Sequence, residues 1–215
     1  MASRDDTGTG DSEETIELLR RARGGERAAL DSLFERHRAR LLRMVEVRLD
    51  PRLRRRIDPD DVLQETLLDA TQRLPAYLER PSLPFFVWLR FLTGQKLLGL
   101  HRYHLGAQCH DADRDVELGS AGLPGASNES LADAALEDED QTPSSAAARV
   151  ELRARLRAAL ENLSEADREI LVLRQFEQLS NAEAAAELGL KPSAASKRFL
   201  RALRRYKEIL DSLQA

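Results

Sequence analysis

Apolar residues recur every three to four positions over long stretches of this chain, which is the spacing of one face of an α-helix. The first stretch covers residues 26–49 and carries the apolar positions Leu30, Phe34, Leu41 and Val45. Two more helices are predicted from Pro59 to about Leu74 and from Phe85 to about Leu105. Asp58 is expected to cap the first of these two, because proline suits the first helical position after it.

A second helical cluster is predicted over residues 149–215. Ser164 is expected to cap one helix, and Ser180 with Glu183 forms a capping-box pattern at the start of another. Gly189 can adopt the left-handed conformation that ends that helix, and Pro192 fits the first turn of the next. A short helix, a glycine turn and a longer helix in this order predict a helix-turn-helix.

The two clusters are separated by residues 106–148, which are rich in Gly, Ser, Ala and acidic residues and lack apolar periodicity. This composition favours a flexible linker, because it buries too little surface to offset the entropy of ordering. Residues 1–25 are expected to form a disordered or partly helical tail. We therefore expect an all-α protein with two small helical domains, 26–105 and 149–215, joined by a flexible acidic linker.

The formal net charge of −4 conceals opposite charges in different segments. Residues 36–56 contain nine Arg and two acidic residues, whereas residues 110–148 contain one Arg and ten acidic residues. The single cysteine, Cys109, excludes an intrachain disulfide and favours a reduced, cytoplasmic setting. The most apolar stretch is interrupted by Arg90 and Lys96, so no insertion into a membrane is expected.

The last predicted helix has two different faces. From Lys191 to Lys207 the chain carries seven basic residues and no acidic ones, and the apolar positions Phe199, Leu203, Tyr206 and Leu210 share the opposite side. The second helix of a helix-turn-helix can enter the major groove of DNA. The candidates for DNA contacts are therefore Ser193, Ala194, Lys197, Arg198, Arg201 and Arg205. The alternative is a solvated basic face, or one that packs on the acidic linker.

An acidic stripe lies along the helix that is predicted to begin at Pro59. Asp61, Glu65 and Asp69 recur at every fourth position beside Gln64. The stripe is either a dock for a basic partner surface or an ordinary solvated face. Nothing nearby supplies a nucleophile or a metal cage at a suitable spacing, which argues against an active site.

Residues 85–105 combine aromatic and basic side chains. Such a mixture can stack on unpaired bases and hold the backbone, so the candidates for single-stranded DNA are Arg90, Gln95, Lys96, His101 and Arg102. The aromatic residues themselves are more simply interpreted as core anchors of a helical bundle. His101, His104, Cys109 and His110 fit no standard zinc spacing, so neither a metal nor another cofactor is expected.

Taken in order, these segments resemble a sigma-70 family RNA polymerase sigma factor of the extracytoplasmic-function (ECF) type. The family's region 2.2, which binds the β′ coiled coil of core polymerase, is similar to DPDDVLQETLLDATQRL, where Asp61, Gln64 and Glu65 match the core-binding motif. Regions 2.3 and 2.4, which open and read the minus-ten promoter element, are similar to PFFVWLRFLTGQKLLGLHRYHL. Region 4, whose helix-turn-helix reads the minus-thirty-five element, is similar to residues 163–208.

The resemblance implies a promoter-specificity factor that is not an enzyme. The partners that it implies are core RNA polymerase, contacted at the β′ coiled coil and the β flap, promoter DNA, and an anti-sigma factor. Ala194 and Ala195 replace a Thr-Val pair of many members, so the promoter sequence is not implied. The segments PFFVWLR and LHRYHLGAQ resemble those of a planctomycete-type ECF group. The alternatives are an autonomous helix-turn-helix repressor or activator, and a polymerase-binding adaptor that does not read DNA.

Overall fold

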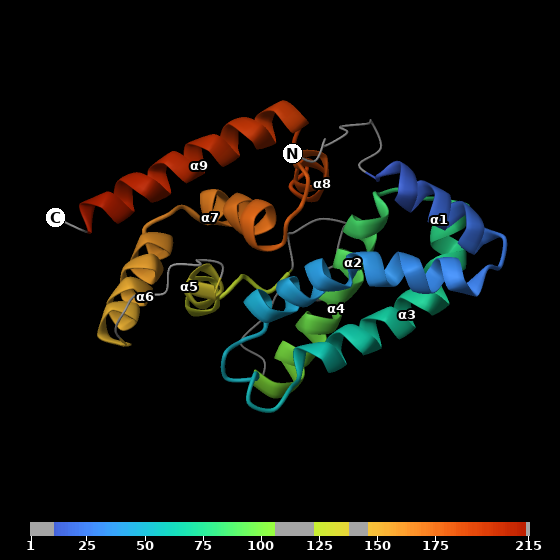
Figure 1. Cartoon of the computed structure of the whole chain (residues 1–215), viewed down its shortest axis with the longest axis horizontal. Coiled ribbons are helices and arrows are strands. Elements are labelled where there is room, and N and C mark those ends of the chain that lie inside the picture. Colours follow the sequence, from blue (N-terminus) through green and yellow to red (C-terminus); the bar gives the residue numbers. More distant parts are fainter. Residues whose placement is uncertain (1–10, 106–122, 138–145, 214–215) are drawn as a thin grey trace.

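Every regular element that the structure describes is a helix, as predicted (Figure 1). The computed structural model describes residues 11–105, 123–137 and 146–213. The N-terminal unit consists of α1 (Glu13–Arg23), α2 (Arg27–Arg48), α3 (Pro59–Glu79) and α4 (Phe85–Leu105). The C-terminal unit consists of α6 (Ala146–Glu161), α7 (Glu165–Leu171), the π-helical turn η1 (Val172–Phe176), α8 (Asn181–Glu187) and α9 (Pro192–Ser212). Helix α5 (Asn128–Glu137) lies between the two units in the sequence.

The helices begin where their capping residues predict. The Asp58 side chain accepts a hydrogen bond from the Asp60 N–H, and the Ser164 hydroxyl accepts one from the Asp167 N–H. Both halves of the capping box between Ser180 and Glu183 are present. Gly189 has a φ of 61°, so the expected left-handed turn after α8 is confirmed. No helix in the described ranges is both long and apolar enough to cross a membrane.

The N-terminal tail is helical in its second half. Helix α1 is capped by the Ser12 side chain and packs against α2, with Leu18 buried between them. Residues 1–10 lie outside the described residues.

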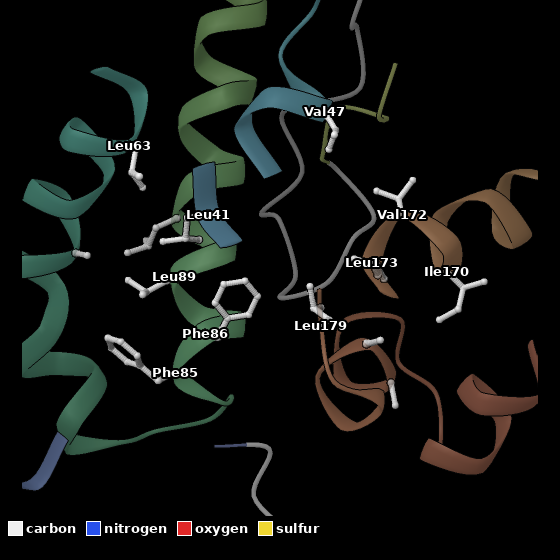
Figure 2. Close-up of a cluster of buried hydrophobic side chains, with 14 of the residues drawn as sticks. Leu41, Val47, Leu63, Phe85, Phe86, Leu89, Ile170, Val172, Leu173 and Leu179 are labelled. Atoms are coloured by element: carbon white, nitrogen blue, oxygen red, sulfur yellow. The ribbon is translucent and has the colours of Figure 1, made fainter. Parts of the chain in front are cut away.

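The aromatic residues of α4 belong to the core, as the simpler interpretation held. Phe85 and Phe86 are completely buried, and Trp88 stacks on Tyr77 of α3 with ring centroids 4.6 Å apart. The same buried cluster continues into the C-terminal unit through Leu173 and Leu179 (Figure 2). The two units therefore share apolar contacts instead of standing apart on a linker.

Helix α3 is longer than its sequence predicts. We expected it to end near Leu74 before Pro75, but it continues through the proline to Glu79. A proline inside a helix costs about 3 kcal/mol. The continued turn places Tyr77 on Trp88 and lets its hydroxyl donate to the Leu83 carbonyl at 2.9 Å, and these contacts offset the cost.

Part of the predicted flexible linker is ordered, which corrects the expectation for residues 123–137. They include helix α5, in which Leu131 and Ala132 have no exposed surface. Arg153 of α6 pairs with Asp133 at 2.6 Å, and the Ser127 N–H donates to the Val47 carbonyl of α2 at 3.0 Å. One small apolar face is enough to order this helix, because helices of both units cover it. Residues 106–122 and 138–145 lie outside the described residues, and the domain boundaries stay predictions.

Candidate functional site

Helices α8 and α9 form the predicted helix-turn-helix. The turn between them is closed by the Leu190 N–H, which donates to the Ala185 carbonyl at 2.8 Å. The Asn181 side chain donates to the Pro192 carbonyl at 2.9 Å and ties the start of α8 to the start of α9. Helix α9 packs on α7, α8 and α6, and it runs along one edge of the molecule (Figure 1).

The buried side of α9 is centred on small residues. Ala195 and Ala202 have no exposed surface, and Phe199 and Tyr206 flank them as partly buried residues. Leu203, which we placed on the apolar face, is 40% exposed. Leu203 follows the buried Ala202 directly and is therefore turned by about 100° from it around the helix, which brings its side chain towards solvent.

Most of the predicted duplex-binding residues are accessible on the outer side of α9. Exposed side chains are those of Ser193, Ala194, Lys197, Arg201 and Arg205, and Arg198 is half-buried. Arg201 also donates to the buried Asp167 carboxylate of α7 at 3.0 Å. Burial alone would raise the pKa of Asp167, but Arg201 and the Ser164 hydroxyl lower it below its usual range. Arg201 therefore both faces solvent and fixes α9 on α7.

The predicted acidic stripe is accessible on α3. Asp61, Gln64 and Glu65 are exposed, and Asp69 is half-buried. The stripe also carries Leu68, which is 66% exposed and which sequence reasoning missed. Its position four residues after Gln64 and seven after Asp61 was the available signal, because these spacings lie on one helix face. The surface is thus an acidic stripe with an apolar residue within it.

One of the predicted single-strand contacts on α4, Lys96, lies against this stripe. Lys96 forms an ion pair with Glu65, and the Gln95 side chain accepts a hydrogen bond from Arg73 at 3.2 Å. His101 accepts the Asp50 N–H at 3.3 Å through Nε2, and burial lowers its pKa. Arg102 is exposed beside Tyr103, which is 84% exposed. Four of the five predicted residues therefore reach the surface at least in part.

Arg90 is the exception and corrects our prediction for this arrangement. Its side chain is completely buried and faces the C-terminal unit, where its Nε donates to Glu177 at 2.6 Å and its Nη1 donates to Glu187. No part of the guanidinium is presented to a nucleic acid. Sequence reasoning missed its partners, although each of these charges lies beside apolar residues, a pattern that indicates burial.

The described residues contain no group of three or more His, Cys, Asp or Glu side chains placed to hold a metal ion. Of the four metal-ligand candidates in the sequence, Cys109 and His110 lie outside those residues.

Comparison with known proteins relates this chain to transcription factors of bacteria. A model of the family described as Sigma-70, region 4 matches residues 153–205, which include the whole helix-turn-helix. The RNA polymerase sigma factor CnrH of Cupriavidus metallidurans is 30% identical over 195 residues, which cover 91% of this chain and 93% of that protein. The ECF RNA polymerase sigma factor SigD of Mycobacterium tuberculosis is 30% identical over 191 residues, covering 89% of this chain and 81% of SigD.

A solved structure is also similar along almost the whole chain. It is the structure of CnrH in complex with the cytosolic domain of CnrY, and it matches with a TM-score of 0.54 and 26% sequence identity. The match covers 93% of this chain and 99% of CnrH in that structure. The similarity therefore includes both helical units.

Proposed function

Because the chain belongs to the ECF group of sigma-70 RNA polymerase sigma factors and so directs promoter-specific transcription initiation, we propose that it binds polymerase and DNA through separate surfaces. The observation that carries the proposal is the exposed basic side of α9 within a complete helix-turn-helix. Sigma factors are non-catalytic. We propose that this chain likewise has no active site and works beside RNA polymerase in the cytoplasm.

We assign duplex recognition at the minus-thirty-five element to α9. Its first turns carry Ser193, Ala194, Lys197 and Arg198, which would face base edges and adjacent phosphates in the major groove. Arg201 and Arg205 would contact phosphates, which position the helix without reading sequence. With two alanines at positions 194 and 195, the base contacts depend mainly on the longer side chains that follow.

We assign core polymerase binding to the acidic stripe of α3. Asp61, Gln64, Glu65 and Asp69 would face the basic β′ coiled coil, and the exposed Leu68 supplies an apolar contact at the centre of the surface. Burial of one apolar side chain among rim charges is typical of protein interfaces. In the C-terminal unit, the exposed Leu200 and Leu203 of α9 are our candidates for the β flap contact.

We assign the minus-ten element to α4. Gln95, Lys96, His101 and Arg102 would contact the melted strand and the adjoining duplex, and Arg90 would join them only when its buried partners are removed. The ion pair between Lys96 and Glu65 supports neighbouring positions for the two proposed surfaces. Such a neighbourhood suits a factor that opens DNA on the polymerase.

We propose that an anti-sigma factor also binds this chain. The support is that CnrH, which is similar over nearly its whole length, was solved with a second protein bound, the cytosolic domain of CnrY.

Run-off transcription on a fragmented library of the source genome, with purified core polymerase, tests the function. With this chain present, new transcripts should start at a fixed distance from a shared two-part motif.

Lys197→Ala with Arg198→Ala should weaken binding of the resulting minus-thirty-five duplex at least tenfold and leave core affinity unchanged. Asp61→Asn with Glu65→Gln should do the reverse. Tight binding of the free chain to a palindrome, without new transcripts, would favour an autonomous repressor or activator instead.

A further inference from the structure

Five charged side chains lie together where the two units meet. Arg48 of α2 and Arg90 of α4 come from the N-terminal unit, and Glu169, Glu177 and Glu187 come from the C-terminal unit. The two arginine side chains are 1% and 0% exposed, and that of Glu177 is 0% exposed. We call this set the interdomain charge cluster.

Glu177 is the centre of the interdomain charge cluster. One carboxylate oxygen accepts from Arg48 Nε at 2.5 Å, and the other accepts from Arg90 Nε at 2.6 Å. Glu169 accepts from Arg48 at 2.5 Å. It lies 3.7 Å from the Nη2 atom of Arg90, and this nitrogen has no hydrogen-bond partner. Burial alone would raise the pKa of Glu177, but the two arginines lower it to about 2. The carboxylate is therefore ionised and bridges both units.

One further ion pair crosses between the units beside the cluster. Arg40 of α2 pairs with Glu183 of α8 at 2.7 Å, and its guanidinium lies 3.5 Å above the centre of the Phe86 ring. The ordered part of the linker contributes as well, because Arg48 donates to the Pro124 carbonyl at 3.0 Å. The first helix of the helix-turn-helix is thus held against α2 through Glu183 and against α4 through Glu187.

This closed arrangement is too short to read both promoter elements at once. The elements are named for positions 25 base pairs apart, which is about 85 Å of duplex. Arg90 touches Glu187, and at most about 18 Å of chain separates Glu187 from the start of α9. Adding the helical rise from Arg90 to His101 and from Pro192 to Lys197 gives a span on the order of 40 Å even if all segments lay in one line, and the Arg90–Glu187 contact adds only the length of two side chains.

We propose that the interdomain charge cluster is a self-inhibiting lock, which keeps the free factor closed until the two units separate on polymerase. The proposal rests on the proposed function, because closure matters only if both units must read one promoter. A charged interface suits a reversible lock. When it opens, water solvates the released charges and offsets the lost ion pairs, whereas removing one partner leaves a buried charge uncompensated. Opening also releases Arg90 beside the other predicted minus-ten residues.

The distance between the units in the free protein tests the lock. Two dyes would be attached through Gln72→Cys on α3 and Glu208→Cys on α9, both exposed, in a Cys109→Ser background. Energy transfer is followed through a urea series, so that a change in the closed-to-open ratio is measurable even if the native chain is almost fully closed. Far-UV circular dichroism on the same samples reports the helices.

Glu177→Gln keeps the size of the side chain and removes its charge. We expect the closed-to-open ratio to fall about a hundredfold or more, so that energy transfer is lost at lower urea while the helical signal persists. Glu151→Gln on the exposed side of α6 is the matched control and should behave as the native chain. Unchanged energy transfer in a folded Glu177→Gln protein would overturn the lock.

A second variant covers the case in which Glu177→Gln loses helical signal. Glu187→Gln removes one partner of Arg90 and leaves both bonds to Glu177, so we expect a shift of about tenfold in the same direction. No shift in this folded variant would equally reject the proposal. No polymerase is present in these measurements, so their results are independent of the transcription assay. If the variants open but the native chain directs no transcription from any promoter, the proposed function is contradicted and the lock still stands.

Discussion

Arginines occupy two very different places in this protein, although the sequence analysis makes both Arg90 and Arg205 candidates for nucleic-acid contacts. Arg48 and Arg90 are completely buried and paired with carboxylates of the other unit. Arg204 and Arg205 of α9 are exposed on a helix whose packing is made by alanines and aromatic residues. The first set holds the molecule together, and the second is available to a partner.

The contrast shows which charged residues can be assigned to the interior or to the surface from the sequence alone. Arg48 follows Met-Val-Glu-Val and Arg90 lies in Val-Trp-Leu-Arg-Phe-Leu, so each basic charge lies beside apolar residues. Arg204 and Arg205 are adjacent to each other and have Arg201 and Lys207 within four residues, so they belong to a group of basic residues. A buried ion pair is weak evidence of net stability, but losing one partner is costly, whereas an exposed charge contributes little in either direction. Burial, and not residue type, therefore decides the role.

The strongest way to break this comparison is to remove one buried arginine. Arg48→Met keeps much of the volume but leaves Glu169 without its 2.5 Å partner and Glu177 with one partner in place of two. The free energy that holds the units together should fall by about 3–5 kcal/mol. Arg205→Ala, on the exposed face, should change it by about 0.5 kcal/mol or less. Urea titration of the dye-to-dye energy transfer measures both, and equal effects would erase the distinction.

The next prediction concerns acid and the buried side of the N-terminal unit. Burial lowers the pKa of His37 to about 3, with the nearby Arg40 and Arg36 adding to the effect, and its ring lies between Phe85 and Phe86. The unfolded chain binds a proton below pH 6.5, but the folded chain does not until about pH 3. The stability is therefore complete above pH 6.5 and declines as the pH falls, by about 2 kcal/mol at pH 5.

His37→Leu isolates this effect from other titrating groups. Asp11, whose pKa is raised by burial to about 6, acts in the opposite direction and is present in both chains. The difference in unfolding free energy between native and variant chains should therefore shrink or reverse between pH 7 and pH 5. His104→Leu, at an exposed position of α4, should leave the native pH dependence intact. A native slope in the His37→Leu protein would show that the buried ring is not the titrating group.

Local signals explain what the sequence predicted well. The caps at Asp58 and Ser164, the capping box at Ser180 and the turn at Gly189 depend on residues within a few positions of one another, so they were visible without a tertiary fold. The helix-turn-helix and the accessible side of α9 followed from them.

The features that the sequence did not predict depend on contacts between residues that are distant in the sequence. Glu177 lies 129 residues after Arg48 and 87 after Arg90, and nothing near either arginine indicates which acid it meets. Helix α5 was interpreted as linker because its small apolar face is buried only by helices from both units. The continuation of α3 past Pro75 likewise depends on a contact with Trp88 in another helix.

The smallest effect, and the sharpest test of accessibility, is the salt dependence of DNA binding by the free chain. On the minus-thirty-five duplex, Arg205→Ala should weaken binding a few fold and reduce the slope of log affinity against log salt by about 1, because one phosphate contact and its released counterion are lost. Arg90→Ala should leave that slope unchanged, since its guanidinium already faces Glu177 and Glu187 and neutralises no phosphate. An equal loss of slope in the two variants would mean that Arg90 reaches this DNA, and that the free chain spends much of its time open.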